Sequence, residues 1–329
     1  MKTELCNKLC IDLPIIQAPI GGAAGAALAA AVSGAGGLGT VTTGSGGRVA
    51  RERIREVRAA TSKPFSVNLL MTYSYEDELE VCLEERVPVV SFFWGDPARH
   101  VERCHAAGTT VLHQVGSVEE ARRAVAAGVD IVVAQGWEAG GHVRGDVATL
   151  PLVPSVVDAV APIPVVAAGG IADGRGLAAV LALGAAGAWI GTRFLASEEA
   201  SVHSYYRQRV LDGTAADTVY TTLFDITWPA APHRVLRNTT VAAWESAGRP
   251  PSGERPGEGD VLATSSHGST VVRYQSTTPR SDHEGDIESF PLWAGQGVGL
   301  VNRIQPAGEI VREIAEDARR ILRRIAADS

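Results

Sequence analysis

The stretch "IPVVAAGGIADGRGLAAVLALGAAGAWIGTRF" (163–194) decides the fold. An apolar run (163–170) is followed by "DGRGLAAVLALG" (173–184), a segment of helical length, and then by a second apolar run within 185–194. Short runs without alternation of polar residues are typical of strands that are buried on both faces. Gly184 is the residue expected just after the end of a helix. The stretch therefore predicts a strand–helix–strand unit of a parallel sheet.

The same unit recurs along the first 200 residues. Further apolar runs occur at 14–19, 37–42, 64–70, 88–94, 109–115 and 130–136, and segments of helical length follow near 48–60, 75–86, 96–107, 117–128 and 153–161. About eight strand–helix repeats favour a closed barrel over a doubly wound sheet, which more often has five or six strands. We therefore predict an α/β fold, a (β/α)8 TIM barrel.

The repeat stops near residue 202. Residues 203–290 look partly helical and partly irregular, with Trp228 and Trp244 as expected packing anchors, and 248–259 is a polar Pro/Gly-rich loop of the kind that is often mobile. The apolar "PLWAGQGVGLV" (291–301) and a final amphipathic helix then return to the barrel. We expect residues 1–202, with about 291–329, to form the barrel, and 203–290 to form a smaller, mainly helical second domain that covers the active site.

Charge and composition exclude several classes of partner. The net charge of -7 argues against nucleic acid and anionic membranes. The longest apolar region, 13–41, is interrupted by Pro14, Gln17 and Pro19 and is not expected to span a membrane. The amino-terminal segment has no secretory pattern, so we expect a cytoplasmic protein. A homo-oligomer is compatible with the sequence.

The cysteines do not indicate a metal site. Cys6, Cys10, Cys82 and Cys104 have spacings that match no zinc pattern, even when His100 and His105 are considered with them. A reducing compartment disfavours disulfides, so we expect four free thiols and no metal.

A TIM barrel has its active site at the carboxyl ends of its strands. Gly169 and Gly170 follow the seventh predicted strand, and Gly191 and Thr192 follow the eighth. In such barrels these two loops bind a phosphate group through backbone N–H groups, and glycine lets the backbone come close to it. The alternative is that the glycines only form tight turns.

A phosphate site indicates a phosphorylated cofactor. Pyridoxal phosphate needs a lysine at a strand tip. The chain has only Lys2, Lys8 and Lys63, and Lys63 precedes the third strand, at the opposite end of the barrel. Flavin mononucleotide (FMN) is the better candidate. Three amides at predicted strand tips could hydrogen-bond its ring edge or ribityl chain, or could instead cap the backbone: Asn68, Gln114 and Gln135.

One titratable ring stands out in the loop "AQGWEAGGHVRG" (134–145). Gly140 and Gly141 precede His142, and their lack of a Cβ would let the imidazole approach a flat cofactor. With an ordinary pKa near 6.5, a histidine can act as a base or as a cation. The alternative is that His142 only hydrogen-bonds its own loop. We expect Glu138 to brace the loop rather than react.

The combination of segments, in order, resembles the nitronate monooxygenase family, formerly called 2-nitropropane dioxygenases. The segments are "PIIQAPIGG" (14–22), "AVSGAGGLGTV" (31–41), "FSVNLL" (65–70), "VVAQGWEAGGHVRG" (132–145), "VVAAGGIADGRGLAAVLALGAAGAWIGTRFLAS" (165–197) and "WAGQGVGLV" (293–301). The resemblance implies an FMN-binding TIM barrel with a smaller helical domain. It also implies oxidation of an alkyl nitronate or nitroalkane by O2, which gives a carbonyl compound and nitrite.

The resemblance also implies residue roles. His142 matches the family's active-site histidine, which would remove a proton from a nitroalkane or hold a nitronate oxygen. Implied flavin contacts are the backbone of Ala18, Pro19, Ile20 and Gly21, the side chains of Asn68 and Gln135, the ring neighbours Gly140 and Gly141, the phosphate ligands Gly169, Gly170, Gly191 and Thr192, and Gln296 closing over the site. Arg144 and His113 depart from the family pattern and put the substrate in question.

Two other functions stay open at this point. Flavin-dependent enoyl reductases, which act on carrier-bound acyl chains with NAD(P)H, share the barrel and an E-x-G-G-H loop. A flavin-binding tailoring enzyme of a biosynthetic pathway is the other alternative. The "AQG" that precedes the loop favours the monooxygenases.

Overall fold

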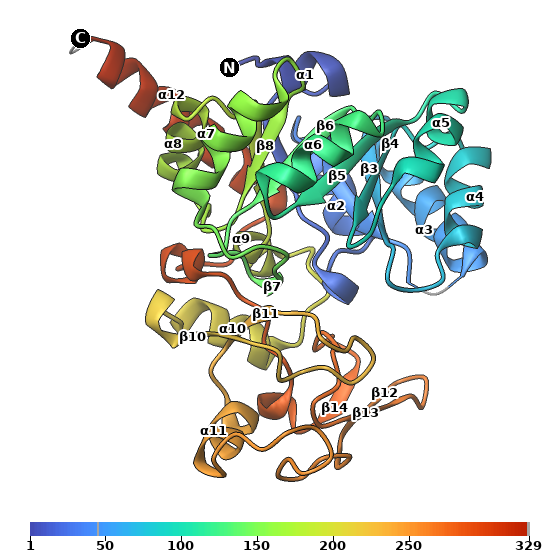
Figure 1. Ribbon diagram of the computed structural model, residues 1–329, viewed down its shortest axis with the longest axis vertical. Coiled ribbons are helices and arrows are strands. Elements are labelled where there is room, and N and C mark those ends of the chain that lie inside the picture. The colour runs from blue at the N-terminus through green and yellow to red at the C-terminus, as the bar shows by residue number, and fades with distance from the viewer. Residues whose placement is uncertain (45, 328–329) are drawn as a thin grey trace.

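The computed structural model describes residues 1–44 and 46–327. Within this part of the chain, eight parallel strands form one sheet (Figure 1). They are β1 (Ile15–Gln17), β2 (Gly39–Thr42), β3 (Phe65–Leu70), β4 (Val89–Phe93), β5 (Thr110–Val115), β6 (Ile131–Gln135), β8 (Val165–Ala168) and β9 (Gly187–Ile190). Each lies within an apolar run from which a strand was predicted.

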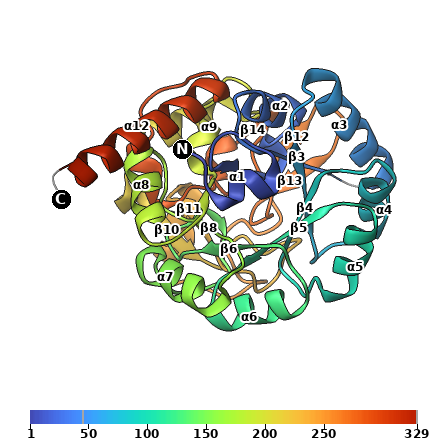
Figure 2. The same cartoon turned by 90° about the horizontal axis from the view of Figure 1, so that it is seen from above.

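The sheet curls into a nearly closed barrel. Its strand order is β1-β9-β8-β6-β5-β4-β3-β2, so chain neighbours are spatial neighbours all the way round. A parallel bridge between Ile16 and Leu38 joins the two end strands. Figure 2 looks down on the ring, with the short helix α1 (Glu4–Leu9) over its centre. The predicted TIM-barrel architecture is confirmed.

Helices cover the outside of the ring (Figure 2). They are α2 (Ala26–Gly34), α3 (Gly47–Ala60), α4 (Glu76–Glu84), α5 (Ala98–Ala106), α6 (Val118–Ala126), α7 (Thr149–Val160) and α8 (Gly174–Ala182), whereas the short α9 (Thr192–Leu195) lies at the carboxyl ends of the strands (Figure 1). Side-chain caps begin two of them: Ser117 accepts a hydrogen bond from the N–H of Glu120, and Asp173 accepts from the N–H groups of Arg175 and Gly176. Such caps satisfy amide groups that have no partner within the helix.

The core has an outer and an inner layer. Branched residues such as Val67, Val90 and Val132 pack between the strands and the helices. Inside the barrel, Leu112 and Val133 pack together with Leu5 of α1, which closes the amino-terminal end. The opposite end, where the strands finish, is left for the loops.

Residues 203–290 lie beyond the carboxyl ends of the strands (Figure 1). They contain α10 (Ser204–Asp212), η2 (Ala215–Asp217), β10 (Thr218–Thr221), β11 (His233–Leu236), α11 (Thr239–Ser246), β12 (Val261–Ser265), β13 (Thr270–Val272), β14 (His283–Gly285) and η3 (Ile287–Ser289). The expected mainly helical character is not confirmed, because short strands are as prominent as helices. The reason is long-range pairing: β11 pairs with β10 and also with β7 (Gly141–His142), a partner that local sequence does not indicate.

The Pro/Gly-rich loop 248–259 is anchored by side-chain contacts, and Arg255 is its most buried charged residue. The side chain of Arg255 is 3% exposed and forms ion pairs with Asp225 and Glu258. Trp228 is buried as expected, and Trp244 is partly buried against a neighbouring cluster.

The chain then returns to the barrel through η4 (Gln296–Leu300) and α12 (Ala307–Ala327). α12 packs on α8 so closely that a Cβ on Gly174 would lie 2.4 Å from the Cβ of Asp317. The packing of the final helix beside the barrel is as predicted, and its last turns extend past the barrel in both views (Figures 1 and 2). No helix among the described residues is long and apolar enough to cross a bilayer.

Candidate active site

A cavity of about 790 Å³ lies at the carboxyl ends of the strands. That volume is in the range of cofactor and ligand sites. The predicted site residues that line it are His142, Ala18, Pro19, Ile20, Gly21, Asn68, Gln114, Gln135, Gly140, Gly141, Gly169, Gly170, Gly191 and Thr192. Gln296 does not line it, although its neighbours Gly295 and Gly297 do.

One wall is made of backbone at the ends of β8 and β9. Gly169 and Gly170 have φ angles of 106° and 71°, in the left-handed region that favours glycine. The amide N–H groups of Gly169, Gly170 and Gly191 donate no hydrogen bond to any residue that the structure describes. We call these three residues the glycine cradle. Unpaired N–H groups that share one wall suit an anionic group such as a phosphate.

The return segment 291–301 packs directly on the cradle. The N–H of Gly295 donates to Oγ1 of Thr192 at 3.0 Å, and the N–H of Gln296 donates to the carbonyl of Glu138 at 2.9 Å. A Cβ on Gly297 would come within 2.8 Å of the carbonyl oxygen of Gly170. The backbone of Gln296 thus holds the return segment against the His142 loop, and a contact of Gln296 with a cofactor stays a prediction.

The loop that carries His142 is braced from two sides. Gln135 donates from Nε2 to the carbonyl of His142 at 2.9 Å and accepts from the N–H of Arg144 at 3.0 Å. Glu138 accepts from the N–H and the hydroxyl of Thr149, at 2.8 and 2.9 Å. The bracing role expected for Glu138 is confirmed. The hydrogen bonds of Gln135 point first to a role in positioning His142.

The other two predicted amides also reach the cavity. Asn68 is buried, and its Oδ1 accepts from the hydroxyl of Ser91 at 2.9 Å, which fixes the orientation of the amide. Gln114 is half-buried at the end of β5. Contacts from these amides to a cofactor stay a prediction.

Three tryptophans surround the imidazole of His142, and we call them the aromatic box. Trp228 stacks on the ring with 3.8 Å between centroids and 23° between planes. Trp293 and Trp94 lie 5.3 and 6.2 Å away. Nε2 of His142 is buried without a hydrogen-bond partner among the described residues.

The box controls the charge of His142. Burial, with a smaller contribution from His233 at 5.4 Å between ring centroids, lowers the pKa of His142 to about 3. Burial also lowers the pKa of His233 to about 4. A low-dielectric site disfavours the charged form of a histidine. Burial therefore disfavours the cationic form of His142, one of the two forms left open by the sequence.

Several cavity residues were missed from the sequence. Trp228 and Trp293 come from outside the barrel repeats, and the rim includes Arg53, Thr278 and Arg280. Trp228 was expected only as a packing anchor. Aromatic residues make up only 5% of the chain, so each tryptophan could have been considered as a site residue from the sequence. In the structure several of the tryptophans lie together.

The two residues that depart from the family pattern lie outside the cavity lining. His113 is buried, and burial lowers the pKa of its imidazole to about 4. Arg144 lies over the ring of Trp94 at 4.9 Å and pairs with Glu120 at 2.8 Å. Arg144 thus supports the outer side of the aromatic box.

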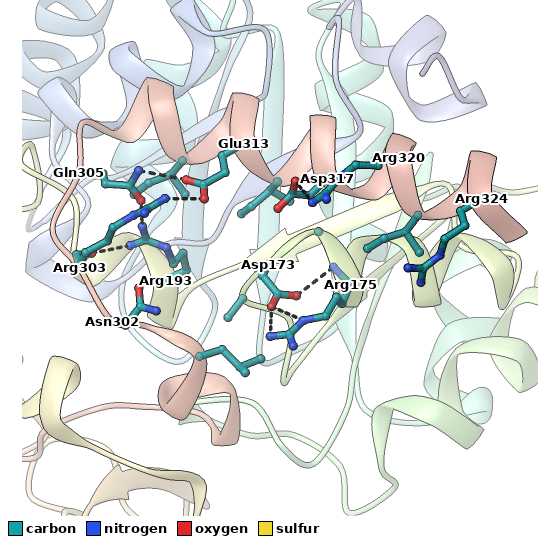
Figure 3. Close-up of a pocket in the computed structure, with 16 residues that line it drawn as sticks. Asp173, Arg175, Arg193, Asn302, Arg303, Gln305, Glu313, Asp317, Arg320 and Arg324 are labelled. Carbon is teal, nitrogen blue, oxygen red and sulfur yellow. Dashed lines mark hydrogen bonds and ion pairs between the residues drawn. The ribbon is translucent and has the colours of Figure 1, made fainter.

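A second cavity, of about 610 Å³, lies between α8 and α12 (Figure 3). Its charges are largely paired with one another: Arg303 with Glu313, Arg175 with Asp173, and Arg320 with Asp317. It contains none of the predicted site residues. In the described ranges the four cysteines are free, and no cluster of His, Cys, Asp or Glu suited to a metal is found.

The fold and the larger cavity define the class: a TIM-barrel enzyme whose site lies at the carboxyl ends of the strands. The nitronate monooxygenase family matches the chain over residues 2–78 and 70–317. The chain belongs to this family, and it is an oxidoreductase.

Individual relatives carry different names. The chain is 37% identical to the nitronate monooxygenase of Pseudomonas aeruginosa, over 97% of this chain and 100% of that protein. It is 40% identical to a (3aS,4S,5R,7aS)-5-hydroxy-7a-methyl-1-oxo-octahydro-1H-indene-4-carboxyl-CoA dehydrogenase of Mycobacterium tuberculosis, over 76% of this chain and 70% of that one. The structure of FabK from Thermotoga maritima superimposes with a TM-score of 0.82 at 34% identity, covering 100% of both chains.

Proposed function

We propose that the protein is an FMN-dependent nitronate monooxygenase, which oxidises an alkyl nitronate with O2 to a carbonyl compound and nitrite. One observation carries the proposal: a neutral, desolvated imidazole and a cradle of unpaired amide N–H groups share the same cavity. The family membership and the Pseudomonas aeruginosa relative support the choice of reaction.

The residues at the strand tips fit FMN. The glycine cradle would hold the phosphate, because its backbone can approach an anion without a Cβ in the way, and Thr192 lies beside it as the first residue of α9. The backbone of 18–21 and the amides of Asn68 and Gln114 would contact the rest of the cofactor, with Gly140 and Gly141 beside the ring. Bound FMN supplies an electron carrier between an organic substrate and oxygen.

His142 would recognise the nitronate as a neutral hydrogen-bonding group. A group with a pKa of about 3 is a weak base for removing a proton from carbon at neutral pH. A neutral imidazole can still donate one N–H to a nitronate oxygen, and this bond is stronger in a site shielded from water. The proposal therefore favours the preformed nitronate anion over the neutral nitroalkane as substrate.

The division of the chain into domains that was expected from the sequence is part of the proposal. Residues 1–202, with about 291–329, would form the FMN-binding barrel, and 203–290 would cover the active site. Trp228 supports this division, since it comes from 203–290 and lies on His142 of the barrel.

Anaerobic mixing with a nitronate tests the proposal. The purified protein should contain FMN or take it up, and its flavin absorbance should fall on mixing with the anion of nitroethane. In air the same mixture should consume oxygen and release nitrite. Absence of both responses with a series of nitronates would contradict the proposed reaction, while absence of flavin uptake would contradict the cofactor.

A second candidate is an FMN-dependent enoyl reductase that uses NAD(P)H on carrier-bound acyl chains. The similarity to FabK favours it, as does the Mycobacterium tuberculosis relative, whose name gives a carboxyl-CoA thioester as substrate. Anaerobic addition of NADH separates the two, because rapid bleaching of the flavin by NADH would favour the reductase. A flavin-binding tailoring enzyme would show bound FMN without turnover in either assay.

A further inference from the structure

The position of Trp228 depends on residues outside the cavity. Trp228 is 4% exposed, although it belongs to the irregular segment 225–232. It packs against Trp94 at 5.3 Å, Tyr73 at 5.5 Å and Phe93 at 6.4 Å between ring centroids, and it stacks on His142. The indole is thus a wedge between the barrel loops and the segment that covers them.

This wedge leaves two polar atoms without partners. Nε1 of Trp228 and Nε2 of His142 are both buried, and neither has a hydrogen-bond partner among the described residues. Burying an unpaired N–H or ring nitrogen is unfavourable. Something other than hydrogen bonding by these rings must therefore hold the indole against the imidazole.

Arg255 supplies that restraint. The backbone N–H of Trp228 donates to the carbonyl of Asp225 at 3.0 Å. The carboxylate of Asp225 pairs with Nη1 of Arg255 at 2.7 Å. The same Nη1 donates to the carbonyl of Leu223 at 2.9 Å.

Arg255 is itself immobilised. It pairs with Glu258, and its guanidinium lies over the ring of Tyr274 at 4.3 Å. With its side chain 3% exposed, little room is left for another rotamer. A buried, planar guanidinium with several fixed partners is well suited to hold two segments in one register.

We propose that Arg255 is a positioning residue for the site: through Asp225 it fixes Trp228 against His142, and Trp228 thereby limits the substrate beside the imidazole to small or flat nitronates. The restraint follows from the contacts alone. The identity of the substrate class rests on the proposed function.

Titration of His142 tests the restraint without any substrate. The titratable group that acts on His142 is His233, with 5.4 Å between ring centroids, and Arg144 lies over Trp94, a neighbour of the imidazole. In histidine-labelled protein followed by NMR, Arg255→Leu should let water reach the imidazole and move its midpoint upward by about one unit or more, toward the ordinary value near 6.5. Arg255→Lys should keep the His142 midpoint closer to its wild-type value than Arg255→Leu does, because lysine retains the positive charge.

A matched control comes from the same part of the chain. Arg209 pairs with Glu288 at 2.7 Å and does not line the cavity, so Arg209→Gln should leave the His142 titration unchanged. Asp225→Asn serves if Arg255→Leu does not fold, since it keeps the shape of the side chain but removes the ion pair. An unchanged His142 titration in either folded variant would overturn the proposal. Unfolding of both variants would also overturn it, because the ion pair of Arg255 and Asp225 would then serve stability alone.

Selectivity tests the second half of the proposal. The anions of nitroethane and nitrocyclohexane differ in bulk beside the reacting carbon. Trp228→Leu should raise kcat/KM for the bulky anion relative to the small one by about tenfold or more. Arg255→Leu should shift the ratio in the same direction, and Arg209→Gln should not.

The two failures are distinguishable. If wild-type protein oxidises no nitronate, the proposed function fails, while the titration still tests the link from Arg255 to Trp228. If nitronates are oxidised and the Trp228→Leu ratio is unchanged, the function stands and the limit on substrate size is wrong.

Discussion

The glycine cradle and the aromatic box lie in one cavity but are built in opposite ways. The cradle is backbone from a single continuous stretch, 163–194, and its shape follows from where two strands end. The box is side chains from three distant places, Trp94, Trp228 and Trp293. A site made of backbone can thus be predicted from sequence, whereas a site made of side chains from distant segments cannot.

The two regions also differ in what they tolerate. Gly169 and Gly170 of the cradle are sensitive to any added Cβ, because glycine at positive φ has no low-energy substitute. The box is sensitive to the size and polarity of its rings, because these set the environment of the imidazole. Substitutions should therefore separate cofactor binding from chemistry.

The largest expected effect is at the centre of the box. His142→Ala should lower kcat with a nitronate by about 10²–10³-fold, which is the usual cost of removing one positioned hydrogen-bond donor to a negative charge. FMN content should stay at the wild-type level, since the cradle is untouched. Oxygen uptake and flavin absorbance measure the two quantities, and loss of the flavin in this variant would break the separation between the regions.

The box should also make the fold sensitive to acid. The pKa values of His142 and His233 are lowered to about 3 and about 4, so between pH 6.5 and 4 the unfolded chain binds more protons than the folded one. Stability should then fall as the pH falls through this window, by about 2 kcal/mol for each histidine between pH 6.5 and 5.

Urea unfolding at pH 7 and pH 5 measures this loss. His233→Gln should make the dependence on pH shallower, because it removes one of the two groups. An equally steep loss in the variant would show that His233 does not contribute.

A smaller effect is expected at the cradle. Gly170 and Gly108 both have positive φ, 71° and 77°, but Gly108 is not among the residues that line the cavity. Alanine at either position should cost stability by about 1–2 kcal/mol. Only Gly170→Ala should also weaken FMN binding, by about tenfold, because relief of the strain would turn the N–H groups away from the phosphate. Reconstitution of the apoprotein with FMN measures the difference, and equal Kd values in the two variants would refute the cradle.

The smallest effect is expected at the outer side of the box. Arg144 is 36% exposed, and it pairs with Glu120 while lying over Trp94. Arg144→Gln should reduce the free energy of unfolding by less than about 1 kcal/mol, as is usual for exposed ion pairs and cation–π contacts. Chemical denaturation measures it. A loss of several kcal/mol would mean that Arg144 contributes more to the stability of the aromatic box than its exposure indicates.

The barrel was predictable because its strands are short apolar runs with helices between them, as in 163–194. Most of the candidate site followed from the same pattern, since strand ends such as Asn68 and Gly191 must meet at one face. The covering segment was less predictable, because β11 pairs not only with β10 but also with the His142 loop, a distant partner that local sequence does not indicate. The neutral state of His142 was also out of reach, because it depends on Trp228, whose position is set by Asp225 and Arg255.

The order in which the parts of the chain appear during translation follows from the return of residues 291–301. Pairing of β1 with β9 needs only the first 190 residues, so a nascent chain can finish the ring of strands early. The wall of the cavity that contains Trp293, Gly295 and Gly297 can form only after these residues have been synthesised. Until then the cavity lacks that wall, so the proposed binding of FMN would be completed only after all the barrel strands have been synthesised.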